Sequence, residues 1–194
     1  MATMEQIKAL RERTGAGIVD VKKALEEANG DEEGAIKILR ERGAAKAVKK
    51  TDREAKEGFI GSYIHTNGKV GSLVKLYCET DFVARNDDFK TLARDIAMHV
   101  AAMNPSVVRP EDVPEETISK EREVWVEQVR QEGKPEAIAE KILAGKEKKF
   151  REETALLTQS FVKDPEVTVE TLISTNVQKM GENIQVGSFV RFEI

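Results

Sequence analysis

The stretch GFIGSYIHTNGKVGSLVKLYCE, residues 58–79, decides the fold. Both of its halves are rich in β-branched and aromatic residues, which favour β-strands. Between the halves, Asn67 and Gly68 form the pair preferred in a two-residue type I′ turn. The stretch therefore predicts a β-hairpin. In its second half, apolar residues such as Leu76 and Cys78 alternate with others, so one face should be buried and the other partly exposed to water.

Helical patterns dominate the chain after the hairpin. A helix with apolar residues at i, i+3, i+4 and i+7 comes first, and two charged amphipathic helices are expected over about 115–132 and 135–152. The segment TALLTQSFVKDPEVT should then be irregular and residues 168–180 helical. The residues assigned to the buried sides of the first three helices are Phe89, Leu92, Ala93, Ile96, Ala97 and Val100, then Ile118, Trp125, Val126 and Val129, then Ile138, Ile142 and Leu143.

The first 45 residues predict three short helices. Thr3 and Gln6 can form a capping box at the start of the first helix. An Asn-Gly pair should end the second helix, and Asp31 is a suitable N-cap for the third, which is expected to end at Gly43. The apolar residues that share one stripe are Ile7, Leu10, Val21, Ala24, Leu25, Ala28, Ala35, Ile36 and Leu39.

These patterns predict an α+β protein. The expected organisation is a three-helix N-terminal domain over residues 1–45, a charged linker over 46–57, and an α+β core over 58–194. In the core, the alternating C-terminal stretch SFVRFEI should pair with the hairpin as a closing strand. The result would be a small antiparallel sheet covered by helices.

The composition narrows the class of protein. The net charge is −4, with 31 Lys and Arg against 35 Asp and Glu, which disfavours nucleic acid as the main partner. The chain lacks the run of about 18 apolar residues that a membrane span needs, and its start does not resemble a secretory signal. Cys78 is the single cysteine, as expected of a protein in a reducing cytosol. We therefore expect a cytoplasmic protein.

The sequence offers little for catalysis. His65 and His99 lie far apart in the chain without nearby cysteines, so no zinc pattern is present. Cys78 falls on the buried side of a predicted strand, where a small core residue is more common than a nucleophile. The segment GAG at 15–17 lacks the lysine of a phosphate-binding loop. These observations favour an interaction protein that needs no cofactor or metal.

Two segments could present apolar residues to a partner. In ETDFVARN, Thr80 or Asp81 can cap the following helical turn, which leaves Phe82 at a strand-to-helix corner. Phe82 either folds back onto the sheet as a staple, which the local pattern alone favours, or projects as an anchor for a partner. Ile18 and Val19 follow two glycines and can lie partly exposed as a contact surface; alternatively Ile18 is a core staple, which the local pattern alone favours.

Two longer motifs carry a resemblance to a known family. LRERTGAGIVDVKKAL at 10–25 and CETDFVAR at 78–85 resemble the two signature stretches of the elongation factor Ts family. The similarity extends to GKPEAIAEKILAGKEKKF and to the terminal VRFEI, so it covers essentially the whole chain. It implies a guanine nucleotide exchange factor for elongation factor Tu, with neither enzymatic activity nor a cofactor of its own.

The resemblance also implies roles for particular residues. Thr80, Asp81, Phe82 and Val83 match the segment that the family uses to dislodge Mg²⁺ from elongation factor Tu, so that GDP leaves and GTP can bind. With Asp81 assigned to the corner, Phe82 would be the wedge. After these contacts the factor dissociates, so it accelerates the exchange without changing its equilibrium.

The N-terminal helices resemble a ubiquitin-associated domain that docks on the partner's nucleotide domain, with Ile18, Val19 and Lys22 as contact residues. The chain has a single core, like the short form of the family, which pairs as a homodimer through its sheet. Lys75 and Tyr77 depart from the family pattern, which has an acidic residue and an asparagine there. Two alternatives remain at this point: a ubiquitin-associated adaptor, and an RNA-binding ribosome factor that would use residues 46–56.

Overall fold

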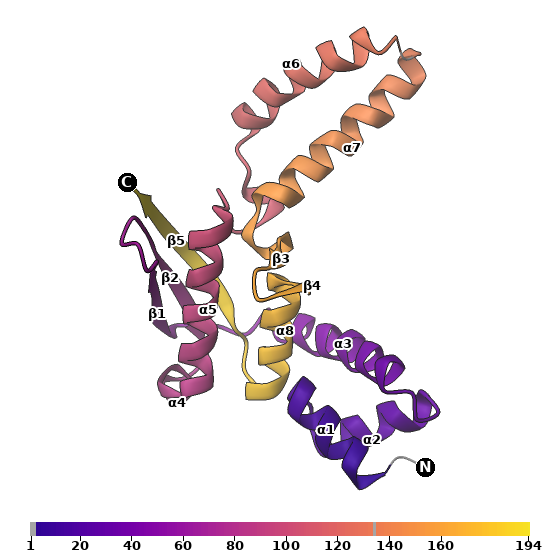
Figure 1. The fold of residues 1–194 in the computed structure, drawn as a ribbon, viewed down its shortest axis with the longest axis vertical. Helices are drawn as coiled ribbons and strands as arrows, with labels where there is room; N and C mark the ends of the chain where they lie inside the picture. The colour runs from indigo at the N-terminus through magenta and orange to yellow at the C-terminus, as the bar shows by residue number, and fades with distance from the viewer. Residues whose placement is uncertain (1–2, 134) are drawn as a thin grey trace. The chain divides into compact units, whose positions relative to one another are not determined.

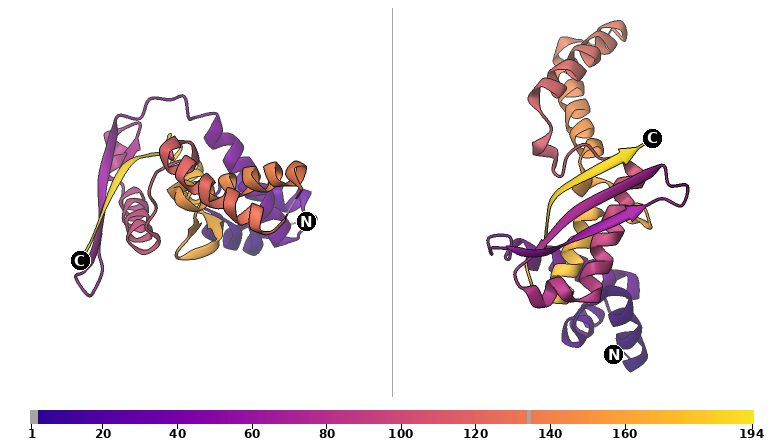
Figure 2. Two further views of the ribbon diagram at one scale, coloured as in Figure 1. Left: turned by 90° about the horizontal axis from the view of Figure 1, so that it is seen from above. Right: turned by 90° about the vertical axis from the view of Figure 1, so that its left-hand side faces the viewer.

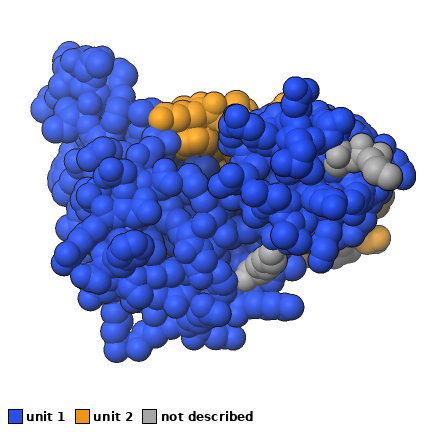
Figure 3. All heavy atoms as spheres, turned by 90° about the horizontal axis from the view of Figure 1, so that it is seen from below, with its two compact units in different colours: residues 1–101, 170–194 blue, residues 102–169 orange. Residues whose placement is uncertain are grey.

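The computed structural model describes residues 3–133 and 135–194, and its fold is drawn in Figure 1. Contacts divide the chain into two compact units, coloured separately in Figure 3. Residues 1–101 and 170–194 form the first unit, and residues 102–169 form the second. Among the described residues, none of the helices combines the length and the apolar character that crossing a membrane requires.

The first unit begins with α1 (Met4–Thr14), α2 (Ile18–Glu27) and α3 (Glu32–Val48). The predicted capping box is present, because the N–H of Gln6 donates to the Thr3 hydroxyl at 3.2 Å and the N–H of Thr3 donates to Gln6 Oε1 at 3.1 Å. Asp31 caps α3 by accepting from the N–H of Gly34 at 3.0 Å. The predicted apolar stripe forms one buried cluster, with Ala28 packed at its margin.

The predicted end of α3 at Gly43 is wrong, because the helix continues to Val48. A glycine inside a helix costs only about 1 kcal/mol relative to alanine. The residues after Gly43 include three alanines, which are the strongest helix formers, and Ala47 is buried. Propensity and packing therefore carry the helix past the glycine and into the segment predicted as a linker.

A three-stranded antiparallel sheet forms the centre of the first unit. β1 (Glu57–Ile64) pairs with β2 (Val70–Cys78), which pairs in turn with β5 (Gln185–Glu193), in the order β1-β2-β5. Both pairings are antiparallel. The α+β class and the closing strand at the C-terminus are confirmed.

The turn between β1 and β2 differs from the prediction. A type I′ turn needs a positive φ at both central residues. Here φ is positive at Gly68 (68°) but not at Asn67. The N–H of Gly68 donates to His65 O, and the N–H of His65 donates to Val70 O, so the loop is longer than two residues. The side chain of Asn67 accepts from the N–H of Lys69 at 3.0 Å, which stabilises this longer loop.

The helix α5 (Asp87–Met103) lies along one face of the sheet, as the left view of Figure 2 shows. All six apolar residues predicted for its buried side are buried. The hydroxyl of Ser72 on β2 donates to Ala97 O of α5 at 2.6 Å. At Gly61 on β1, a Cβ atom would lie 2.3 Å from Ala93 O, so only glycine allows the helix to approach this closely.

The rest of the first unit is α4 (Asp81–Arg85), which joins β2 to α5, and α8 (Val169–Met180), which precedes β5. The prediction of a helix over residues 168–180 is confirmed. An ion pair of 2.8 Å joins Lys179 of α8 to Asp88 of α5.

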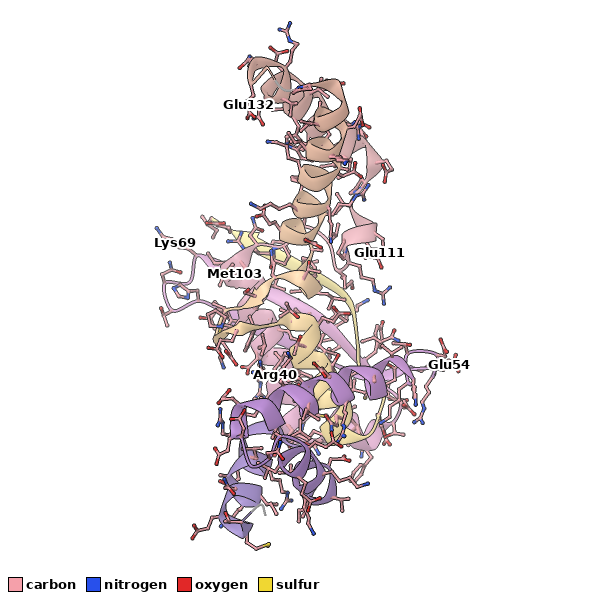
Figure 4. The ribbon with its side chains drawn as sticks, turned by 90° about the vertical axis from the view of Figure 1, so that its right-hand side faces the viewer. Arg40, Glu54, Lys69, Met103, Glu111 and Glu132 are labelled. Carbon is pink, nitrogen blue, oxygen red and sulfur yellow. The ribbon has the colours of Figure 1, made fainter. Side chains whose placement is uncertain are left out.

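The second unit is built around a helical hairpin of α6 (Glu115–Gln131) and α7 (Glu136–Thr154). Glu132, labelled in Figure 4, directly follows α6. The ring of Trp125 packs edge-on against Phe150 with centroids 5.7 Å apart. Two predicted core residues are wrong, because Val126 is 45% exposed and Ile138 is 49% exposed. A hairpin of two helices has a single narrow seam, so residues beside that seam stay in solvent.

The remaining elements of the second unit are short. They are the 3₁₀ helices η1 (Pro110–Asp112) and η2 (Leu156–Thr158) and the two-stranded sheet of β3 (Ser160–Phe161) and β4 (Asp164–Thr168). The expectation of an irregular segment here is wrong. Strands of two and five residues with a register shift and an internal proline leave no readable alternation.

Candidate functional site

A strand-to-helix corner presents the most exposed aromatic side chain among the described residues. At the end of β2, Thr80 is the N-cap of α4, with extended backbone angles and a hydroxyl that accepts from the N–H of Val83 at 3.4 Å. The helix has only five residues and lies against β1 and β2. A single helical turn is not stable alone, so its cap and its packing must hold it.

The apolar residues of this corner differ sharply in burial. Val83 and Ala84 are buried, and Val83 is only 5% exposed. Phe82, one position earlier, is 79% exposed. Successive residues of a helix point about 100° apart, so the turn that buries Val83 must direct Phe82 elsewhere. The alternative in which Phe82 folds back onto the sheet is therefore wrong.

Glu182, which the sequence patterns did not single out, holds this corner from the loop between α8 and β5. Its Oε2 accepts from the backbone N–H groups of Glu79 at 3.0 Å and Thr80 at 3.1 Å. Its Oε1 accepts from the hydroxyl of Thr80 at 2.6 Å. Since the partners lie 102 and 103 residues apart in the chain, no local pattern could have revealed this contact.

Asp81 is already paired within its own helix. Its carboxylate lies 3.1 Å from the guanidinium of Arg85, one turn later, and both side chains are largely exposed. Such exposed pairs contribute only about 0.3–0.5 kcal/mol. The pair therefore leaves Asp81 available to other partners at small cost.

The start of α2 brings the other predicted contact residues together. Gly17 is the N-cap and offers no side chain to the helix. Ile18 is 52% exposed and Val19 is 65% exposed, so the alternative in which Ile18 is a core staple is wrong. Lys22 lies one turn later, exposed, with its ammonium 3.9 Å from Glu26. Together, Ile18, Val19 and Lys22 form a small apolar surface with one adjacent positive charge.

The outer face of the three-stranded sheet, opposite α5, is a third exposed apolar surface. We define this outer sheet face by Ile60, Ile64, Leu73, Val190 and Phe192, all of which are exposed. Leu73 pairs with Val190 across β2 and β5, and Gly71 separates Ile64 from Phe192, which leaves a shallow apolar hollow. Lys69, labelled in Figure 4, lies at the margin of this hollow.

The site offers binding surfaces and little reactive chemistry. Burial raises the pKa of the Cys78 thiol to about 11, and the Glu182 carboxylate adds to the shift. The thiol is therefore protonated at neutral pH, and it donates to Thr80 O at 3.2 Å. Within residues 3–133 and 135–194, no group of three or more His, Cys, Asp or Glu side chains could hold a metal ion.

Comparisons with known proteins match this chain along its whole length. The sequence profile described as "Elongation factor TS" matches residues 4–194. The chain belongs to the elongation factor Ts family. Over 194 residues it is 54% identical to elongation factor Ts of Carboxydothermus hydrogenoformans and 55% identical to that of Thermosipho melanesiensis. These matches cover the whole of this chain and 89% and 99% of the relatives. Elongation factor Ts of Rubrobacter xylanophilus is 54% identical, and both chains are covered completely.

Membership of the elongation factor Ts family confirms the predicted function. Elongation factor Ts is the nucleotide exchange factor for elongation factor Tu in translation elongation, it acts in the cytoplasm, and it is not an enzyme. The family assignment therefore favours nucleotide exchange over the adaptor and the RNA-binding factor that the sequence left open.

Proposed function

We propose that Phe82 is the side chain with which this chain opens the nucleotide site of elongation factor Tu. The observation that carries the proposal is the contrast between Phe82, which is 79% exposed, and its buried neighbours Val83 and Ala84. Exposing a large aromatic side chain on a fixed turn is unfavourable in water unless a partner buries it. Burying a phenylalanine contributes about 1.5–3 kcal/mol.

Insertion of Phe82 would act on the Mg²⁺ site of elongation factor Tu. Mg²⁺ bridges the phosphates and the protein in such GTPases, so a shift of the segments that carry its ligands weakens GDP binding. The coupling is reciprocal: if the factor weakens GDP binding by some ratio, GDP weakens the binding of the factor by the same ratio. Thr80 and Asp81 form the corner, and Val83 anchors it. GTP then enters and the factor dissociates.

The start of α2 supplies a second contact in this proposal. Ile18 and Val19 would pack on the nucleotide domain of elongation factor Tu, with Lys22 beside them. In this proposal residues 1–45 form a docking domain, residues 46–57 a linker whose first residues continue α3 to Val48, and residues 58–194 the core that carries Phe82. The buried cluster of α1, α2 and α3 supports a separate docking role, because it leaves these two apolar side chains outside.

We also propose that two copies of the chain pair through the outer sheet face. Contiguous exposed apolar patches on soluble proteins commonly mark interaction sites. Ile60, Leu73, Val190 and Phe192 all lie on one side of one sheet, and a second copy offers the same residues across a two-fold axis. Pairing would bury side chains that a single copy leaves in water.

Release of a fluorescent GDP analogue from elongation factor Tu tests the role of Phe82. We expect Phe82→Ala to lower the stimulated release rate about 100-fold, which is typical of removing a dominant aromatic contact. Its melting temperature should stay unchanged because the side chain is exposed. Val124→Ala, which truncates an exposed apolar residue of α6, is the control and should retain full activity. Normal exchange by Phe82→Ala would refute the proposal.

Light scattering tests the pairing of two copies. The unaltered protein should have twice the mass of one chain, and Leu73→Glu combined with Val190→Glu should have the mass of one chain. Four carboxylates would then lie close together in an apolar interface, and their mutual repulsion and desolvation oppose association. A single-chain mass for the unaltered protein at micromolar concentration would contradict the proposed dimer.

A further inference from the structure

We propose that Glu182 is a positioning residue that sets the direction of Phe82 before the partner arrives. The proposal rests on the function proposed above, in which Phe82 contacts elongation factor Tu. Glu182 itself is half-buried beneath the corner, and its carboxylate is engaged by groups of this chain. It acts through the backbone that carries Phe82.

The carboxylate of Glu182 binds the corner through both of its oxygens. Its two oxygens accept three hydrogen bonds from two consecutive residues, two from backbone N–H groups and one from the Thr80 hydroxyl. Hydrogen bonds to an ionised acceptor are shorter and about twice as strong as neutral ones. Because Oε1 and Oε2 bind at different points, the backbone of Glu79 and Thr80 is fixed in orientation as well as in position.

The same carboxylate also acts on the helix cap. The Thr80 hydroxyl donates a hydrogen bond to Glu182, so the lone pairs of the hydroxyl oxygen are available to accept from the N–H of Val83. The carboxylate therefore orients the hydroxyl in the direction that an N-cap requires. The backbone angles of Thr80 begin α4, and Phe82 lies in its first turn. Glu182 thus determines where the exposed ring is aimed.

Glu182 itself is anchored by the residues beside it. Gly181, with a φ of 81°, ends α8 and turns the chain into the short connection to β5. The next residue, Asn183, is buried, and its N–H donates to the Glu79 carboxylate at 2.6 Å. Its side chain donates to Arg53 O at 2.7 Å. Residues 79–80 and 182–183 are therefore joined by four hydrogen bonds, none of which involves Phe82.

Loss of the Glu182 carboxylate should weaken the affinity for elongation factor Tu and leave the maximum rate of GDP release nearly unchanged. If the corner samples several orientations, only the competent fraction binds, and the apparent dissociation constant rises by the inverse of that fraction. We expect Glu182→Ala to raise the concentration that gives half-maximal GDP release about tenfold, equivalent to about 1.4 kcal/mol. The rate at saturation should change less than about twofold, since Phe82 is still present.

Two variants serve as controls. Glu182→Gln keeps an oxygen that can accept from both N–H groups, so it should restore half-maximal release to within about threefold of the unaltered protein. Glu170→Ala removes an exposed carboxylate from α8 and should change nothing. If Glu182→Ala leaves the half-maximal concentration unchanged, the proposal is wrong.

A double-mutant cycle separates this proposal from the function on which it rests. If Glu182 acts through Phe82, then Glu182→Ala has no further effect in a Phe82→Ala background, and the two losses are not additive. A full further tenfold loss in that background would overturn the positioning role. If Phe82→Ala alone has no effect, the proposed function fails instead.

Amide hydrogen exchange gives a readout that does not need elongation factor Tu. In Glu182→Ala, the amides of Val83 and Ala84 should exchange about tenfold faster, while the amides of β2 that pair with β5 should be unchanged. Equal acceleration throughout the sheet would show a general structural role and would refute the proposal. Unchanged exchange at Val83 would refute it as well, whatever the kinetics show.

Discussion

The first turns of α2 and α4 both present apolar side chains to solvent, but different interactions hold them. The N-cap of α4 is Thr80, whose side chain caps the helix and donates a hydrogen bond to the carboxylate of Glu182. The N-cap of α2 is Gly17, which has no side chain to cap the helix, and its carbonyl accepts from the N–H of Val21 at 2.9 Å. The exposure of a side chain therefore does not show whether its direction is set before a partner binds. The hydrogen bonds of the backbone that carries the side chain do show this.

The difference suits different tasks. A side chain that must enter a narrow site gains affinity when its direction is set beforehand, because less ordering is needed on binding. An apolar pair on a docking surface can adjust as it packs. We therefore expect substitutions at the two helix starts to differ in their effects, and the following predictions are arranged from the largest effect to the smallest.

Thr80→Ala should have the largest effect on stability. It removes the cap of α4 and a hydrogen bond to an ionised carboxylate, for a loss of about 2 kcal/mol in the free energy of unfolding. The matched change Gly17→Ala in α2 should cost less than about 1 kcal/mol, because no side-chain cap is lost there. Urea unfolding monitored by circular dichroism measures both values. Equal losses would show that the two helix starts are held alike.

Alkaline pH should loosen the α4 corner through Cys78. Burial raises the pKa of the thiol from 9.0 to about 11. Between these two pH values the thiol of the native protein therefore stays protonated, whereas the thiol of the unfolded chain is deprotonated. The contribution of the protonated thiol to the free energy of unfolding is complete below pH 9 and is lost as the pH rises toward 11. Between pH 8 and pH 10 the unaltered protein should lose about 1.4 kcal/mol more stability than Cys78→Ala.

Unfolding free energies of the two proteins at several pH values check this effect. Parallel curves for the two proteins would contradict it. Amide exchange in α2, which has no cysteine, should follow the same pH dependence in both proteins.

The double substitution Ile18→Ala with Val19→Ala should have the smallest effect. Both side chains are more than half exposed, so unfolding should change by less than about 0.5 kcal/mol. GDP release from elongation factor Tu should become about fivefold slower at limiting factor concentration, equivalent to about 1 kcal/mol. The fluorescent GDP assay measures it, with Met4→Ala on α1 as the control. A loss as large as that of Phe82→Ala would remove the distinction between the two helix starts.

Local patterns predicted most of the secondary structure, because those signals act within a few residues. The Thr3 capping box, the Asp31 cap and the apolar stripe of α5 were all legible in the sequence. The failures have physical causes. α3 passed Gly43 because later alanines and packing outweighed one glycine, and β3 and β4 were too short to show alternation.

The candidate site was predictable only in part. Its residues could be named from the TDFV motif, but local pattern favoured a buried Phe82, and the structure leaves that ring in solvent. Burial depends on which face of α4 meets the sheet, and residues 80–85 alone do not specify this.

The sequence by itself determined the α+β class, the N-terminal helices and the family, because periodicity, caps and long motifs are properties of contiguous residues. Only the tertiary structure decided that Phe82 is exposed and that the outer sheet face is apolar. It also decided that Glu182 reaches Thr80 across 102 positions in the chain. The physical reason is that these features depend on contacts between segments far apart in the chain. α4 packs against β1 and β2, and the pairing of β5 with β2 completes the outer sheet face and brings Glu182 to Thr80.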